Sequence, residues 1–96
     1  MKVIFDELAQ EEFNDAIEYY EFEVEGLGKK FKEEIKRAFR IIKRFPKIGV
    51  VDEGDIRIYI LHKFPYKILY SIEKDYIYII AIAHMHREPN YWLKKD

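Results

Sequence analysis

The 96-residue sequence contains no cysteine, which excludes a disulfide framework and a metal site built on thiolates. It has only four glycines and three prolines, and no stretch reads as a linker, a repeat or a low-complexity segment. Its longest apolar run, residues 76–83, is far too short to span a bilayer. The N-terminus carries one lysine and no apolar signal core, so we expect a cytoplasmic protein with one domain, residues 1–96.

Apolar residues make up 49% of the chain and aromatic residues 17%, which is enough for a packed core and argues against disorder. The net charge of −1 conceals an asymmetry. Residues 1–28 carry nine acids and one lysine, whereas residues 29–96 have a net charge of +7. This distribution is typical of a surface that meets a polyanion or an acidic partner, and equally of a solvated helix face.

Two helices are predicted in the first half of the chain. Asp6 stands at an N-cap position, and Gly26-Leu27-Gly28 separates two apolar stripes at helical spacing. Pro46 ends the second stripe because proline cannot continue a helix. The short break predicts an antiparallel helical hairpin. The stripes consist of Ala9, Phe13, Ala16, Ile17, Tyr20 and Val24, and of Phe31, Ile35, Ala38, Phe39 and Ile42.

Four strands are predicted around these helices. Residues 3–5 form a short β-prone run, and apolar alternation with a period of two begins at Ile56. Residues 66–72 continue it, and residues 76–83 are apolar on both faces, as in a central strand. Pro89 ends regular pairing. The fold class is therefore α+β with the order β-α-α-β-β-β, the hairpin lying on one face of a mainly antiparallel four-stranded sheet.

The uncovered face of this sheet is the first candidate site. If Ile56, Ile58 and Ile60 face the helices, then Arg57, Lys63 and Lys67 lie close together on the open face. Arginine can hold phosphate bidentately, and lysines attract it, so this face is a candidate for nucleic-acid binding. The alternative is that all three are ordinary surface residues.

The C-terminal tail gathers the second group of candidate residues. His84 and His86 can transfer protons near neutral pH, Arg87 can hold a phosphate, and Tyr91 can stack on a base. Alternatively, the histidines are a strand-end and a loop residue, and Tyr91 and Trp92 close the core. His-x-His spacing alone is weak evidence for a metal, and we expect neither a metal nor a cofactor.

The chain resembles the RelE/ParE toxin superfamily, and in particular its ParE-like "plasmid stabilization" branch. The resemblance covers nearly the whole sequence in order and spacing. It rests on residues 6–20 with Glu18-Tyr19-Tyr20-Glu21, and on Gly26-Leu27-Gly28, Phe31, Pro46, Ile56-Arg57, residues 64–70, residues 81–84, Arg87, Pro89 and Trp92.

The resemblance implies the toxin of a type II toxin–antitoxin pair, neutralised by a small protein antitoxin. RelE-like members cut messenger RNA inside the ribosome, and ParE-like members block DNA gyrase without hydrolysis. In a metal-independent endoribonuclease that uses 2′-hydroxyl attack, Arg57, His84, His86, Arg87 and Tyr91 would be catalytic, and Lys63 and Lys67 would bind RNA. We expect the first of these activities, growth arrest by ribosome-dependent cleavage of messenger RNA; the alternatives are gyrase inhibition without hydrolysis and an inactive protein-interaction module.

Overall fold

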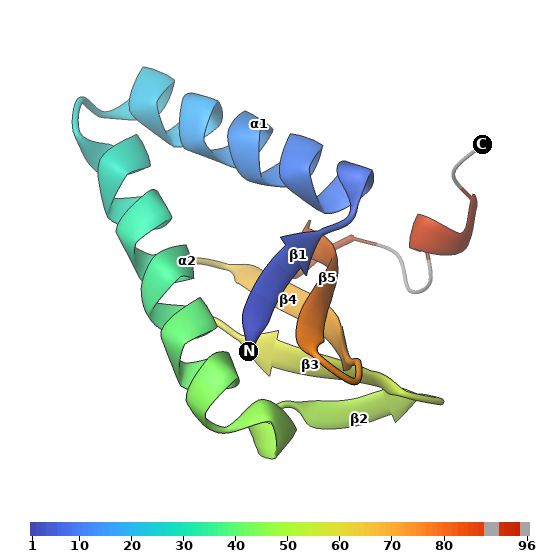
Figure 1. Cartoon of the computed structure of the whole chain (residues 1–96). Coiled ribbons are helices and arrows are strands. Elements are labelled where there is room, and N and C mark those ends of the chain that lie inside the picture. Colours follow the sequence, from blue (N-terminus) through green and yellow to red (C-terminus); the bar gives the residue numbers. More distant parts are fainter. Residues whose placement is uncertain (88–90, 95–96) are drawn as a thin grey trace.

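Two helices cover one face of a five-stranded sheet in the computed structural model, which describes residues 1–87 and 91–94 (Figure 1). Pro89 lies outside the described residues, and so does the end of strand pairing that we expect there. The elements in chain order are β1 (Lys2–Phe5), α1 (Glu7–Glu23), α2 (Leu27–Arg44), the 3-10 turn η1 (Pro46–Ile48), β2 (Val50–Glu53), β3 (Ile56–Ile60), β4 (Tyr66–Ile72), β5 (Tyr76–His84) and the 3-10 turn η2 (Tyr91–Lys94).

The helical hairpin forms where the sequence predicts it. The Asp6 side chain accepts a hydrogen bond from the Leu8 N–H at 2.9 Å and so caps α1. Gly26 adopts a φ of +85°, which a residue with a side chain rarely tolerates, and this turns the chain into α2. A Cβ on Gly28 would lie only 2.6 Å from the Ile17 carbonyl oxygen. The absence of a side chain at Gly28 therefore allows the two helices to approach closely.

The strand order in the sheet is β1-β5-β4-β3-β2. β1 pairs with β5 in parallel, and the other three pairings are antiparallel. The mainly antiparallel architecture is confirmed, but the sheet has one strand more than the four expected. β2 went unpredicted because it lies at the sheet edge and all of its residues, Val50–Glu53, are exposed. Such a strand has no buried face to impose alternation.

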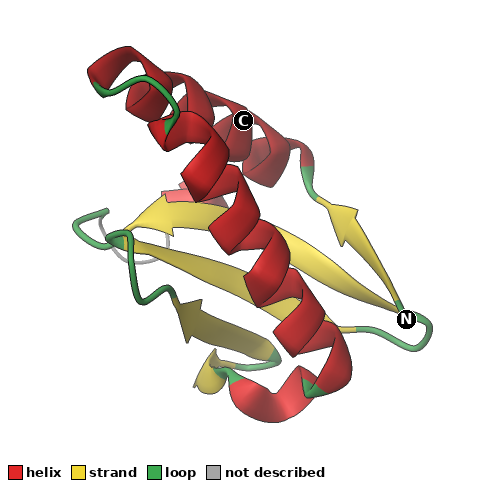
Figure 2. Ribbon diagram, turned by 90° about the vertical axis from the view of Figure 1, so that its left-hand side faces the viewer, coloured by secondary structure: helices red, strands yellow, loops and turns green. Residues whose placement is uncertain are grey.

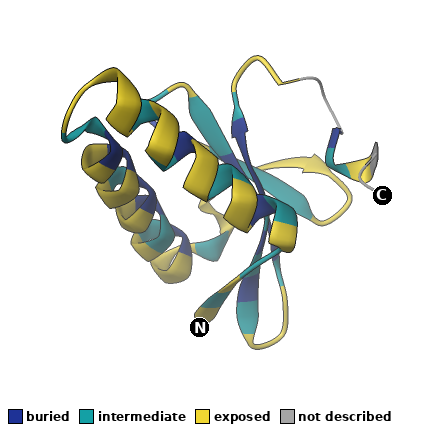
Figure 3. Ribbon diagram, turned by 90° about the horizontal axis from the view of Figure 1, so that it is seen from above, coloured by how far each residue is buried: buried dark blue, intermediate teal, exposed yellow. Residues whose placement is uncertain are grey.

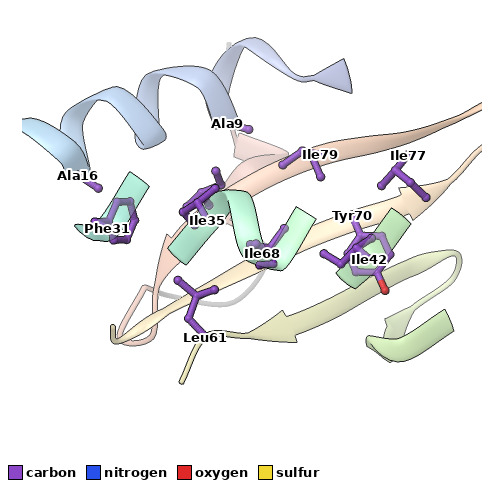
Figure 4. Close-up of a cluster of buried hydrophobic side chains, with 12 residues drawn as sticks. Ala9, Ala16, Phe31, Ile35, Ile42, Leu61, Ile68, Tyr70, Ile77 and Ile79 are labelled. Atoms are coloured by element: carbon purple, nitrogen blue, oxygen red, sulfur yellow. The ribbon is translucent and has the colours of Figure 1, made fainter. Parts of the chain in front are cut away.

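The main core lies between the helices and the sheet, with α2 crossing the strands (Figure 2). Its largest fully buried side chains include Phe31 and Ile35 from α2 and Ile68 and Ile79 from the sheet (Figure 4). A smaller apolar cluster covers the opposite face, where Tyr91 of η2 packs on Leu69, Ala81 and Ala83. Neither helix within the described residues is long and apolar enough to cross a membrane.

Tyr70 fixes η1 and the start of β2 to the centre of the sheet. Its buried hydroxyl donates to the Pro46 carbonyl at 2.6 Å and accepts from the Gly49 N–H at 2.9 Å. Both backbone groups are thereby satisfied. The chain leaving α2 is thus held against β4 before it returns as β2.

Candidate functional site

A β-bulge in the middle of β5 sets the geometry of the tail. Leu69 pairs with Ala81 but the next residue of β4, Tyr70, pairs with Ile79, so Ile80 is extra. Ile80 and Ala81 consequently both belong to the cluster on the open face. The residue that follows, Ile82, points back to the main core. The bulge therefore places Ile82, and with it His84 two residues later, on the helical side, while Ala83 between them faces the open side.

Glu12 of α1 joins the two ends of the chain. Its carboxylate accepts a hydrogen bond from the Ile82 N–H at 2.9 Å, a group with no strand partner because β1 has already ended. It also accepts a hydrogen bond from the Tyr91 hydroxyl. Burial raises the pKa of Glu12, while the hydrogen bonds from Tyr91 and Ile82 and the charge of Arg87 lower it. Burial and the bond to Glu12 raise the pKa of Tyr91, so its hydroxyl remains protonated.

Arg87 lies over Tyr91, with its guanidinium carbon 4.3 Å from the ring centroid. This is the geometry of a cation–π contact. Tyr91 is only 7% exposed, because it is covered on one face by Arg87 and packs on the sheet with the other. In this arrangement neither the Tyr91 ring nor its hydroxyl is available to a nucleotide.

His84 and His86 lie together beside a cleft between α1 and the end of β5. Their rings are 5.2 Å apart, and the His84 ring meets Tyr66 edge-on at 5.3 Å. The His86 N–H donates to His84 Nδ1 at 3.1 Å. The cleft has a volume of about 450 Å³ and is lined by Leu8, Glu11, Glu12, Asp15, Ala16, Tyr19, Tyr66, Ile82, His84 and Arg87. In this cleft three acids of α1, Glu11, Glu12 and Asp15, lie near two of the predicted site residues, His84 and Arg87.

The predicted orientation of β3 is wrong. Ile56 and Ile58 face the open side of the sheet, whereas Tyr59 and Leu61 pack against the helices. Arg57 shares the helical side and donates from its guanidinium to the carbonyls of Lys47 and Gly49, at 3.2 Å and 2.8 Å. Arg57 therefore holds η1 in place and does not lie on the open face.

Arg57 and the tail lie in different parts of the molecule. Arg57 pairs with Tyr70, which pairs with Ile79, whereas His84 lies further along β5, at its end. At about 3.3 Å per residue and about 4.8 Å between strands, the Cα atoms of Arg57 and His84 are roughly 15–20 Å apart. One phosphate group cannot bridge both places.

The two lysines do not join Arg57 either. Lys63 lines a groove on α2 together with Arg37 and Arg40. Lys67 lies opposite Ile60 and Ala83 in the sheet, on the open face where Leu69 follows it. The predicted single basic face formed by Arg57, Lys63 and Lys67 is therefore not present.

Comparison with known proteins identifies the family. The family model described as "ParE toxin of type II toxin-antitoxin system, parDE" matches residues 3–89. The chain belongs to this ParE toxin family. A search of the curated proteins gave no match.

Two solved structures share the fold of this ParE-family protein. One is the chromosomal ParDE toxin–antitoxin system from P. aeruginosa, with a TM-score of 0.62, 13% identity and coverage of 88% of this chain and 95% of that one. The other is the isolated E. coli RelE toxin, with a TM-score of 0.66, 20% identity and coverage of 94% and 89%. The resemblance to the RelE/ParE superfamily is thus confirmed for family and fold.

Sequence reasoning missed Glu12 and Tyr66 of this ParE-family protein. Glu12 is one of many acids on α1, and its partners Ile82 and Tyr91 are distant in sequence, so no local signal distinguishes it. Tyr66 was predicted as a strand residue, and only the pairing of Tyr66 with His84 places it at the cleft. Among residues 1–87 and 91–94, no group of three or more His, Cys, Asp or Glu side chains could hold a metal ion.

Proposed function

We propose that this protein is the toxin of a type II toxin–antitoxin pair and that it arrests growth by binding DNA gyrase, without hydrolysing nucleic acid. Membership of the ParE family supports the toxin function. The dispersion of the basic groups supports binding in preference to RNA cleavage. Cytoplasmic localisation, where both gyrase and an antitoxin are found, is part of the proposal.

The argument against cleavage is geometric. Attack by a 2′-hydroxyl requires a base, an acid and a group that offsets phosphorane charge, all around one phosphate. Here Arg57 is held by backbone carbonyls of residues 47 and 49, and Tyr91 is covered by Arg87 and bound to Glu12. A toxin that acts by binding protein requires no such convergence.

Ribosome-dependent cleavage of messenger RNA is the second candidate, and the tail favours it. His84 and His86 lie with their rings 5.2 Å apart, Arg87 lines the same cleft as His84, and imidazole is a common general acid or base in catalysis. In this alternative His84 or His86 moves the proton and Arg87 offsets phosphate charge. No metal takes part.

Expression of the chain in growing cells separates the two candidates. We expect growth arrest with DNA damage and intact messages, and inhibition of supercoiling by purified gyrase. Cut messages with normal DNA would reject gyrase inhibition. In that event the triple variant His84→Ala, His86→Ala, Arg87→Ala should lose roughly 10²–10⁴-fold in cleavage. Lys74→Ala, in the exposed β4–β5 turn, is the control. Absence of growth arrest would reject the toxin function itself.

A further inference from the structure

A second stripe of residues runs along α1 beside its buried face. Leu8, Glu12, Asp15, Tyr19 and Phe22 follow one another at spacings of four, three, four and three, so they form a nearly straight line on the helix. We call these five residues the outer stripe. The side of α1 turned away from the sheet is largely exposed (Figure 3). No element of the described chain covers the outer stripe at its Phe22 end, where Phe22 is 90% exposed.

Two hollows make the outer stripe a groove. The cleft of about 450 Å³ at its start and a shallow hollow of about 360 Å³ at its end share Asp15 and Tyr19. The second hollow is lined by Asp15, Glu18, Tyr19 and Phe22. Tyr19 is 59% exposed, so two large aromatic side chains stand at one end of the groove. Adjacent exposed aromatic groups are typical anchors of a protein interface.

The charge along the groove is negative on balance, because four acids of α1 (Glu11, Glu12, Asp15 and Glu18) line it against Arg87 of the tail. Glu11, Asp15 and Glu18 line it, and none of the three forms an ion pair with another described residue. Glu12 is already bound by Ile82 and Tyr91. Carboxylates next to aromatic rings form a suitable environment for arginine and lysine side chains, which can pair with the acids and stack on the rings.

We propose that the outer stripe docks a positively charged amphipathic helix of the antitoxin, which deepens the proposed toxin function and rests on it. From Leu8 to Phe22 the stripe spans roughly 21 Å at about 1.5 Å per residue, so a partner helix of about four turns covers it. Its basic side chains lie opposite Asp15 and Glu18. Its apolar side chains cover Tyr19 and Phe22.

A second copy of this chain fits the groove less well. The exposed residues of α2 are charged throughout and mostly basic, so α2 of another copy has the charge opposite to that of the acids in the groove. However, it offers no exposed apolar side chain that could cover Phe22. The exposed residues of α2 are Lys29, Lys30, Lys32, Glu33, Lys36, Arg37, Arg40, Lys43 and Arg44.

The first test uses two synthetic 16-residue helical peptides with leucine on one face and flanking positions that are all arginine or all glutamate. We expect the basic peptide alone to bind the purified full chain in fluorescence anisotropy. Phe22→Ser and the pair Asp15→Arg, Glu18→Arg should each weaken binding about tenfold or more. The pair Glu33→Arg, Glu34→Arg on α2 adds the same charge and should have little effect. The proposal would be overturned if both double variants lost the same affinity for the basic peptide, or if Phe22→Ser lost none.

The second test measures neutralisation in cells that express the antitoxin. Phe22→Ser should remain toxic and escape neutralisation, with an unchanged unfolding midpoint because Phe22 is exposed. Full neutralisation of a toxic Phe22→Ser variant would reject the docking site and leave the toxin function intact. If the wild-type chain is not toxic, the toxin function is rejected. The peptide measurement would then be the test of whether the groove binds a basic amphipathic helix. A dimer of the free protein that dissociates in Phe22→Ser would assign the groove to a second copy.

Discussion

At the scale of single residues, Glu12 shows how one carboxylate can organise a distant segment. It satisfies a backbone N–H left without a strand partner and binds the hydroxyl of Tyr91. Arg87 closes the other side of the Tyr91 ring. The tail residues that look like a set of catalytic groups in the sequence are thus partly occupied in holding the C-terminal segment on the sheet.

Glu12→Gln should change how stability depends on pH. Burial raises the folded-state pKa of Glu12 above 4.5, so the folded state holds the proton more tightly than the unfolded state. The stability that Glu12 contributes is fully present below its unfolded pKa and is lost as pH rises through its folded pKa. Glutamine does not titrate and keeps an acceptor for Ile82. Urea unfolding should therefore show that the variant gains stability relative to the wild type as the pH rises from below the unfolded pKa of glutamate, about 4.3, through the raised folded-state pKa of Glu12.

Glu11→Gln is the matched control for this measurement, since Glu11 neighbours Glu12 in sequence but is exposed. Its stability should follow the wild-type pH profile. Parallel profiles for Glu12→Gln and the wild type would contradict the role assigned to Glu12.

Tyr70→Phe should destabilise the fold by about 1–3 kcal/mol, because it leaves two backbone groups without a partner. These are the Gly49 N–H and the Pro46 carbonyl, both bound by the Tyr70 hydroxyl. Tyr19→Phe removes a hydroxyl from an exposed ring and should have little effect. Equilibrium unfolding in urea compares the two, and equal stabilities would show that the hydroxyl of Tyr70 does not hold η1.

At the scale of elements, the sequence predicted both helices and four of the five strands, but it could not orient β3. That strand is apolar on both sides, since Ile58 meets the open-face cluster and Tyr59 meets the helical core. Alternation identifies such a strand without saying which face is inside. The bulge at Ile80 was equally hidden, because β5 is apolar throughout and an inserted apolar residue leaves no trace in the pattern.

The packing of α1 on α2 depends on Gly28. Gly28→Ala places a Cβ 2.6 Å from the Ile17 carbonyl and 3.0 Å from Glu21 Cβ, so the helices must separate. We expect a loss of about 1–3 kcal/mol, as for other overpacked interfaces. Lys29→Ala, at the neighbouring exposed position, is the control. Thermal unfolding should show a lower midpoint for Gly28→Ala only, and an unchanged midpoint would mean that the hairpin has room to relax.

At the scale of the whole molecule, the C-terminal segment covers one end of the open sheet face. A chain ending at Arg87 loses Tyr91, which is 7% exposed and packs on Leu69, Ala81 and Ala83. Its burial alone contributes about 1.5–3 kcal/mol, so we expect a lower free energy of unfolding and binding of an apolar dye to the uncovered face. Leu93→Ala, at a position that is 68% exposed, leaves Tyr91 in place and should behave as wild type. Absence of dye binding to the shortened chain would contradict this arrangement.

The parallel pairing of β1 with β5 has a consequence for folding during synthesis. Residues 2–5 cannot pair until residues 76–79 have left the ribosome, so β1 joins the sheet only after the other strands have been synthesised. Contacts this distant in sequence also make folding slow. During synthesis the sheet is therefore incomplete, and the nascent chain does not yet present the folded surface that a target would bind. A partner that is already present in the cell, such as the antitoxin that we propose, can bind the finished surface as soon as the sheet is complete.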